Sequence, residues 1–184
     1  TAELAEIAAV AGSSAAAGVM AAKMGETEAN EKPAGKLTAF LSGTAIPLAE
    51  VKDGVFSEGI LGDGMAIIPE SDTLYAPADA EIAALMPDSR HACGLKLENG
   101  MEVLLHIGID TVGMNGDGFE YLVQEGQKVS AGTPLIKFDR AKIKAAGHPD
   151  VTVCIISNPG NAKSIRFLTG MKATENETAV ATFQ

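Results

Sequence analysis

Two of the three histidines, His91 and His106, are the residues whose type and spacing best suit chemistry. Asn99-Gly100 lies between the two apolar runs that carry them, and this dipeptide is the strongest short-range signal for a β-hairpin. If these two residues form the turn, Cys93 lies opposite His106. His91 is two residues from Cys93 and shares its face of the strand. The imidazoles of His91 and His106 are then diagonal neighbours on one face of the hairpin.

Such a pair has two chemical uses. Two adjacent imidazoles cannot both be cationic cheaply, so at least one stays neutral near pH 7. A neutral imidazole nitrogen is a nucleophile or a metal ligand. The alternative is a hydrogen-bonded structural pair with no reactivity. The third histidine, His148, precedes a proline in a loop, and we expect no role for it.

The predicted pairing also assigns the apolar residues of the hairpin to two faces. We expect the histidine face to include Leu95, Leu97 and Leu104, and the opposite face to hold Ala92, Val103, Leu105 and Ile107.

The elements around the hairpin follow from the pattern after residue 35. Short apolar runs alternate with turn residues, which predicts an all-β fold, an antiparallel β-sandwich or barrel with short helical turns. We expect a helical turn at Lys142–Ala146. The expected strands are Leu37–Phe40, Gly43–Pro47, Gly64–Ile68, Thr73–Tyr75, Glu81–Leu85, His91–Leu97, Glu102–Ile107, Leu135–Phe138, Thr152–Ile156 and Ala179–Phe183.

The amino-terminal part differs in composition from the rest. Residues 1–35 are rich in alanine and end in a polar run, which predicts an Ala-rich segment followed by a flexible linker. We therefore assign one folded domain to residues 36–184. Because the chain starts with Thr1 and not with methionine, we expect it to be a module of a longer protein.

Charge and cysteine content exclude several functions. The chain has 24 acidic and 14 basic residues, a net charge of −10, which disfavours nucleic acid and anionic membranes and suits a basic protein partner. No apolar run reaches the roughly 18 residues of a membrane span. Two cysteines without CxxC spacing predict neither a disulfide framework nor a zinc ribbon, so we expect a reducing, cytoplasmic setting.

Several motifs in order resemble one family, the glucose-type enzyme IIA domain of the bacterial phosphoenolpyruvate-dependent sugar phosphotransferase system. Leu105-His106-Ile107-Gly108-Ile109-Asp110-Thr111-Val112 resembles the phosphorylation site of that family almost letter for letter, and Ser89-Arg90-His91-Ala92 resembles its [ST]-x-H-A motif. The other matching segments are residues 62–69, 75–79, 116–119, 125–129 and 155–158, and Ala80 stands where glycine is usual.

The resemblance implies a duplicated hybrid motif-like fold and a phosphotransferase that works through a phosphohistidine. It implies that His106 takes a phosphoryl group from the phosphocarrier protein HPr. His106 would pass the group to a cysteine of a sugar-specific IIB domain, which can lie in the same polypeptide together with a membrane IIC domain. No cofactor or metal is implied. No Walker-type loop is present, so ATP is not the expected donor.

The resemblance also suggests roles for residues around His106. His91 would donate to a phosphoryl oxygen, and Ser89 would orient His91 by a hydrogen bond. Asp110 lies on the His106 face if that strand continues, and there it would repel the phosphate and pair with an arginine of a partner. Asp53 matches an acidic position of the family.

Four apolar residues complete the expected partner-binding surface. They are Phe56, Leu61, Leu104 and Val112, which would form a collar for docking. For Leu104 and Val112, a place in the core is an equal alternative.

Three other functions remain open from the residues alone. His106-x-x-x-Asp110 has the ligand spacing of a zinc-dependent hydrolase of related β fold, although the required H-x-H pair is absent. Residues 125–135 resemble half of a biotinyl or lipoyl domain, without its exposed lysine motif. A domain that docks on other proteins according to its phosphorylation state is compatible with the main prediction.

Overall fold

The computed structural model describes residues 35–184. Within this part the chain forms fourteen strands in three sheets and one short α-helix, α2 (Arg140–Ala145), and every strand pair is antiparallel. The predicted all-β class is therefore confirmed. No helix among these residues is long and apolar enough to cross a membrane.

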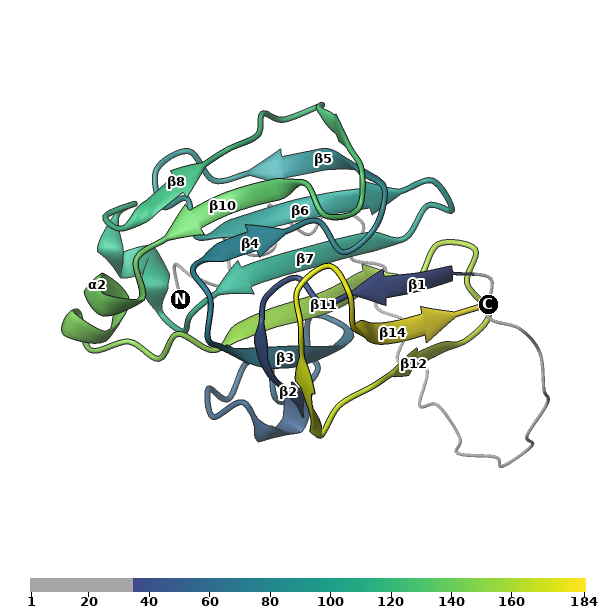
Figure 1. The fold of residues 1–184 in the computed structure, drawn as a ribbon, viewed down its shortest axis with the longest axis horizontal. Helices are drawn as coiled ribbons and strands as arrows, with labels where there is room; N and C mark the ends of the chain where they lie inside the picture. Colours follow the sequence, from purple (N-terminus) through teal and green to yellow (C-terminus); the bar gives the residue numbers. More distant parts are fainter. Residues whose placement is uncertain (1–34) are drawn as a thin grey trace.

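The largest sheet has eight strands and carries the histidine hairpin near its middle (Figure 1). Its strands are, in spatial order, β13 (Met171–Ala173), β2 (Gly43–Pro47), β3 (Asp63–Pro69), β11 (Thr152–Asn158), β7 (Glu102–Ile107), β6 (Ala92–Leu97), β5 (Ala80–Leu85) and β9 (Lys128–Val129).

Two three-stranded sheets complete the fold and pack against the large sheet (Figure 1). One consists of β1 (Gly35–Thr38), β14 (Ala179–Phe183) and β12 (Ile165–Phe167). The other consists of β4 (Thr73–Tyr75), β10 (Pro134–Phe138) and β8 (Phe119–Tyr121). Two short 3₁₀ helices, η1 (Leu48–Glu50) and η2 (Thr111–Met114), lie in connections.

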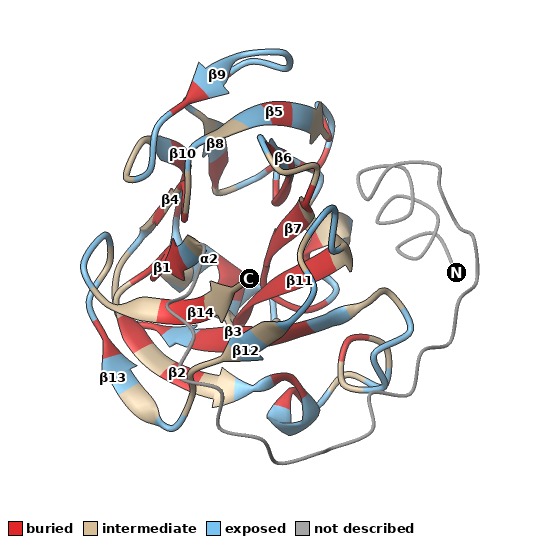
Figure 2. Ribbon diagram, turned by 90° about the vertical axis from the view of Figure 1, so that its right-hand side faces the viewer, coloured by how far each residue is buried: buried red, intermediate tan, exposed pale blue. Residues whose placement is uncertain are grey.

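The large sheet buries side chains on both faces. The main core lies between it and the small sheets and includes Leu105, Ile107 and Cys154. A second cluster, with Leu104, Val153 and Phe56, covers the other face. Figure 2 shows the buried residues concentrated in the central strands, among them β3, β7 and β11. Because alternate residues of β7 point to opposite faces, His106 belongs to the side of the second cluster.

All ten predicted strands are present, and four of them, including β2 and β7, have the predicted bounds. The sequence prediction missed β8, β9, β12 and β13, which have only two or three residues and too little alternation to be recognised. The helix begins two residues earlier than predicted, because the Asp139 side chain accepts a hydrogen bond from the Lys142 N–H and caps it.

The predicted register of the histidine hairpin is wrong by one residue. Leu97 and Met101 close a three-residue loop, in which Gly100 has a φ of +83°, and such a loop shifts the pairing relative to a two-residue turn. His106 consequently pairs with Ala92, and Cys93 pairs with Leu105.

A shift of one residue moves every side chain of a strand to the other face. Ala92 therefore shares the face of Leu104 and His106, and Leu95 and Leu97 lie in the main core. The predicted faces of these residues are corrected accordingly.

The predicted Ala-rich segment and linker, residues 1–35, lies outside the described residues except for Gly35, which opens β1. Both cysteines of the chain are unpaired and buried. Burial raises the pKa of each thiol to about 12.

A candidate active site of two buried histidines

His106 stands one residue before the end of β7, between paired strands on both sides. Its backbone neighbours are Ala92 on β6 and Val153 on β11. The side chain is fully buried. Its Nδ1 lies 2.9 Å from the carbonyl oxygen of Gly108. A carbonyl only accepts, so this contact assigns the proton of His106 to Nδ1 and leaves the lone pair on Nε2.

The carbonyl of Gly108 can reach His106 because the chain turns sharply after β7. Gly108 has a φ of +76°, and a Cβ added there would lie 2.4 Å from Cγ2 of Thr111, so only glycine fits. The Thr111 hydroxyl donates to the Ile107 carbonyl and holds the turn. The turn thus brings a carbonyl oxygen to the second ring nitrogen of His106.

His91 reaches His106 from just outside the sheet. β6 begins at Ala92, and Arg90 has a left-handed φ of +55°. The Nε2 atoms of His91 and His106 are 3.0 Å apart, and the rings meet edge to face at an interplanar angle of 89°. The predicted convergence of the two imidazoles is thus present, although it comes from the irregular backbone at Arg90 and not from strand alternation.

Hydrogen bonding assigns complementary tautomers to the pair. Because Nε2 of His106 carries a lone pair, the short contact requires that Nε2 of His91 donate the proton. The pair therefore consists of a nucleophilic nitrogen on His106 and an N–H donor on His91, pointing at each other.

Both imidazoles are held in the neutral state. Burial lowers the pKa of His106 to about 4, although the Gly108 carbonyl and the charges of Asp53 and Asp110 act in the opposite direction. Burial, and next the neighbouring His106, lower the pKa of His91 to about 3. At neutral pH His106 therefore has its lone pair available for attack.

These pKa values predict an acid-sensitive fold. An unfolded histidine titrates near 6.5, so between about pH 6.5 and about pH 4 the unfolded chain binds more protons than the folded one. The stability that the two neutral imidazoles contribute is therefore fully present above about pH 6.5 and is lost as the pH falls toward their folded-state pKa values. We expect urea denaturation to show a free energy of unfolding that falls over this range by roughly 1.4 kcal/mol per pH unit for each of the two imidazoles.

A control variant separates the effect of the two histidines on stability from that of carboxylates, which also titrate in acid. A double variant, His91→Gln with His106→Gln, should lose stability less steeply over this range, whereas His148→Gln should follow the wild type. Equal slopes in wild type and double variant would contradict the assignment of neutral, buried imidazoles.

Ser89 does not make the hydrogen bond predicted from the sequence. Its hydroxyl and Nδ1 of His91 are both buried, and neither has a hydrogen-bond partner among the described residues. The Ser89 backbone carbonyl lies near the ring and acts to raise the pKa of His91, but Nδ1 does not meet it at hydrogen-bond geometry. Ser89 therefore lies beside His91 without fixing its ring.

The two acidic residues lie close enough to His106 to affect its pKa. β7 ends at Ile107, so the condition for Asp110 to share the strand face of His106 is not met; the turn at Gly108 brings Asp110 near His106 instead. The Asp53 carboxylate accepts hydrogen bonds from the backbone N–H groups of Phe56 and Ser57. Asp53 thereby holds the segment that places Phe56 over the site.

The predicted apolar collar is only partly at the surface. Leu61 and Val112 are partly exposed and remain candidates for partner contact. Leu104 is fully buried in the second cluster, because alternation on β7 points it there, and this burial favours the core alternative for Leu104. Phe56 is also buried, and its ring centroid lies 4.9 Å from that of His106.

One residue near the pair was missed by sequence reasoning. The hydroxyl of Tyr121, on β8, forms hydrogen bonds with backbone groups of the segment that carries His91. It follows Phe119, the last residue of a family-like motif, but no spacing rule predicts which backbone groups a tyrosine will reach. Phe119 itself packs near His91, with ring centroids 6.3 Å apart.

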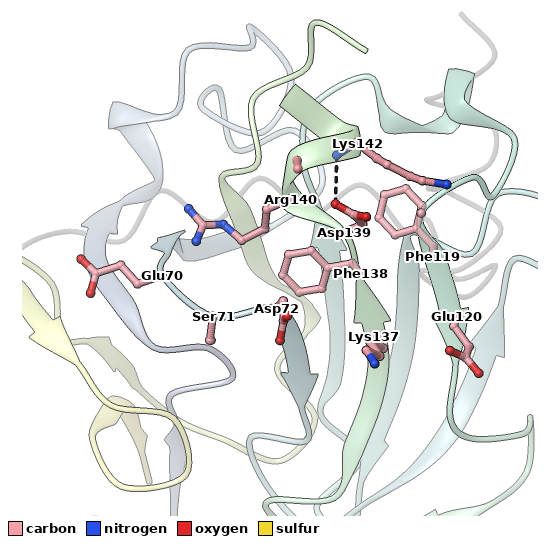
Figure 3. A pocket seen from close by; sticks show the side chains of 12 residues that line it. Glu70, Ser71, Asp72, Phe119, Glu120, Lys137, Phe138, Asp139, Arg140 and Lys142 are labelled. Atoms are coloured by element: carbon pink, nitrogen blue, oxygen red, sulfur yellow. Dashed lines mark hydrogen bonds between the residues drawn. The ribbon is translucent and has the colours of Figure 1, made fainter. Parts of the chain in front are cut away.

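A surface pocket among the described residues includes neither histidine of the pair. It has a volume of about 760 Å³, and no predicted site residue lines it. Figure 3 shows acidic and basic side chains around Phe119 and Phe138 in this pocket. Two of its cations have partners of their own: Arg140 pairs with Asp150, and Lys142 with Asp117. The pocket therefore does not compete with the histidine pair as the reactive site.

Comparison with known proteins gives consistent matches. A family model described as phosphoenolpyruvate-dependent sugar phosphotransferase system, EIIA 1, matches residues 35–162. The glucose-specific EIIA component of this system in Bacillus cereus is 41% identical over 144 residues, which cover 78% of this chain and 87% of the relative. The glucose permease IIA structure from Mycoplasma capricolum has a TM-score of 0.72 at 37% identity, covering 80% of this chain and 94% of that chain.

A longer relative contains the same domain. The glucose-specific EIIBCA component of Corynebacterium glutamicum is 41% identical over 145 residues, which are 79% of this chain and 21% of the relative. The chain thus spans about one fifth of the length of that relative.

Fold and site together define an all-β domain with two buried, neutral histidines whose Nε2 atoms face each other. The matches specify which such domain this is: the chain belongs to the EIIA family of the phosphoenolpyruvate-dependent sugar phosphotransferase system. The zinc-hydrolase alternative receives no support from these comparisons.

Proposed function

We propose that Nε2 of His106 is the atom through which this EIIA domain carries its phosphoryl group. The observation that supports this most directly is the contact between the Nδ1 of His106 and the Gly108 carbonyl. It leaves the Nε2 lone pair pointing at a donor, the imidazole of His91. The proposed donor is the phosphohistidine of HPr, and the proposed acceptor is a cysteine of a sugar-specific IIB domain.

Each transfer exchanges one bond for another. The Nε2 lone pair attacks phosphorus in line with the bond to the donor, whose imidazole leaves with the electron pair. Phosphorylation at Nε2 leaves a positive charge on the ring of His106. The Gly108 carbonyl, which accepts from the Nδ1–H, stabilises this charge. In the second step the incoming thiolate attacks the same phosphorus, and the Nε2–P bond breaks with its electrons returning to His106.

Charge stabilisation is the second requirement of phosphoryl transfer, since the transition state spreads negative charge over three oxygens. The N–H of His91 lies 3.0 Å from Nε2 of His106, so a small ring displacement lets it donate to a phosphoryl oxygen. Asp53 and Asp110 act oppositely: their charges near His106 repel the phosphoryl group and keep it transferable.

Access to His106 requires movement of the Phe56 ring, which packs against it. Because Phe56 and both histidines are buried, we propose that partner docking displaces Phe56 and exposes Nε2. Truncation of this ring in Phe56→Ala should increase the rate of His106 modification by diethylpyrocarbonate several-fold, measured by mass spectrometry. His148, in the loop after α2, is the internal control and should react at an unchanged rate.

Global unfolding of the Phe56→Ala variant must be separated from local exposure, because Phe→Ala in a core costs about 3–5 kcal/mol. Thermal melting of the same sample checks that the fold persists at the assay temperature. An unchanged modification rate in a folded variant would show that Phe56 does not limit access.

The charge of the chain fits the proposed partners. The net charge of −10 favours association with a basic donor protein. Because one relative is an EIIBCA component, the proposed IIB acceptor can lie in the same polypeptide as the EIIA domain. We further propose a cytoplasmic location, where phosphoenolpyruvate and the general phosphocarrier proteins occur.

Phosphate labelling tests the proposal. The chain is incubated with phosphoenolpyruvate, enzyme I and HPr, and intact mass is measured. We expect one added phosphate that is stable in base and labile in acid, as for a phosphohistidine. Absence of label, or an acid-stable phosphate, would overturn the proposed function.

A further inference from the structure

The backbone before His91 contains an interruption that the hydroxyl of Tyr121 fills. β5 and β6 pair as far as Leu85 and Cys93, so Met86 and Ala92 are the next opposed residues. Their expected direct hydrogen bond is replaced by a bridge. The Met86 N–H donates to the Tyr121 hydroxyl oxygen at 2.8 Å, and that hydroxyl donates to the Ala92 carbonyl at 2.5 Å.

The bridge closes the segment that carries His91. Within residues 86–91 the Arg90 N–H donates to the Met86 carbonyl, and Arg90 has a left-handed φ of +55°, a conformation that costs free energy for a residue other than glycine. The surrounding contacts must therefore hold it. Tyr121 ties both ends of the segment to β8, a strand of one of the small sheets.

The side chain of His91 depends on this backbone for its position. Its Nε2 contacts His106, and its Nδ1 has no hydrogen-bond partner among the described residues. Apart from His106, no side chain among the described residues makes a hydrogen bond to the ring, so its placement depends on the backbone on either side. On one side the His91 carbonyl accepts from the Ile107 N–H, and on the other the Tyr121 bridge holds Ala92 and Met86.

We propose that Tyr121 is a positioning residue for phosphoryl transfer, whose bridging hydroxyl sets the location of the His91 N–H relative to Nε2 of His106. This inference rests on the proposed function of the pair. Burial raises the pKa of Tyr121 above its usual value, so the hydroxyl keeps its proton and remains a donor. A misplacement of about 1 Å in such a group can cost on the order of 10²-fold in rate.

The test is a double-mutant cycle in the chain as it stands. Tyr121→Phe removes the hydroxyl and keeps the ring packing. We expect its phosphoryl transfer to fall about tenfold or more in the wild-type background and not to fall further in the His91→Gln background. The matched control is Tyr75→Phe, at the other tyrosine of the chain, which should transfer at the wild-type rate.

A second readout follows His91 directly and needs no phosphate donor. In ¹⁵N NMR spectra the ring nitrogens of His91 should change chemical shift in Tyr121→Phe and stay unchanged in Tyr75→Phe. If Tyr121→Phe does not fold, 3-fluorotyrosine incorporated into a Tyr75→Phe chain keeps the ring and hydroxyl and alters only the hydrogen bonds of position 121. The same His91 shifts are then expected.

The outcomes separate the two proposals. Equal rate losses in the wild-type and His91→Gln backgrounds, or unchanged His91 resonances, would overturn the positioning role and leave the proposed function standing. Failure of the wild-type chain to gain phosphate on His106 would overturn the proposed function, and the NMR comparison would still decide whether Tyr121 positions His91.

Discussion

The variant His106→Gln should incorporate no phosphate from phosphoenolpyruvate, enzyme I and HPr. Glutamine approximates the reach of the imidazole, but its amide has no lone pair of comparable nucleophilicity. The geometry around His106 leaves no substitute among the described residues: His91 carries its proton on the nitrogen that faces the site, and the two cysteine thiols are buried with raised pKa values. Intact-mass measurement after labelling gives the result directly.

Two controls accompany the His106→Gln experiment. His148→Gln removes a histidine from a loop outside the site and should label like the wild type. Thermal melting should show that the His106→Gln variant is folded, and loss of the buried imidazole should make it less sensitive to acid. Normal labelling of His106→Gln would mean that another residue accepts the phosphate, and the assignment of the site would then be wrong.

The second large effect is expected for His91→Gln. This variant keeps His106 and the bond of its Nδ1 to the Gly108 carbonyl, so it should still accept phosphate. Onward transfer should be slow, because the imidazole N–H that would stabilise the developing charge is gone. Loss of one such donor typically costs about 10²–10³ in rate.

Single-turnover measurements separate the two steps of His91→Gln. Acceptance is followed by the gain of phosphate from HPr, and donation by its loss to an added IIB domain. The Tyr75→Phe variant is a suitable control, since that side chain lies on β4 and makes none of the contacts described for the pair. Loss of acceptance itself would assign His91 to the first step, and rapid donation would remove it from the mechanism.

Much of the fold follows from local sequence patterns. The strands of five or more residues, such as Gly43–Pro47 and Glu102–Ile107, are recognisable as short apolar runs between turn residues. The strands missed by sequence reasoning, such as Lys128–Val129, are too short to show any period. They exist because neighbouring strands offer backbone partners, and those partners are distant in sequence.

The length of the turn in the histidine hairpin cannot be predicted from the local sequence. Asn99-Gly100 correctly predicts a turn, but its length of two or three residues depends on how the flanking strands pair with the rest of the sheet. The three-residue loop exchanges the faces of Ala92 and Leu95 relative to the prediction. Leu104, which the sequence allowed as either collar or core, is buried because alternation on β7 points it into the second cluster.

By itself, the sequence identified the residues that could react: a histidine at position 106 and a second histidine in range of it. These features depend on residue type and short spacing, which the chain carries locally. Only the tertiary structure decided that Phe56 covers the pair and that Ser89 leaves the ring of His91 unfixed. It also decided that Tyr121 bridges the backbone before His91. These contacts join segments far apart in the chain, so packing determines them and no local spacing encodes them.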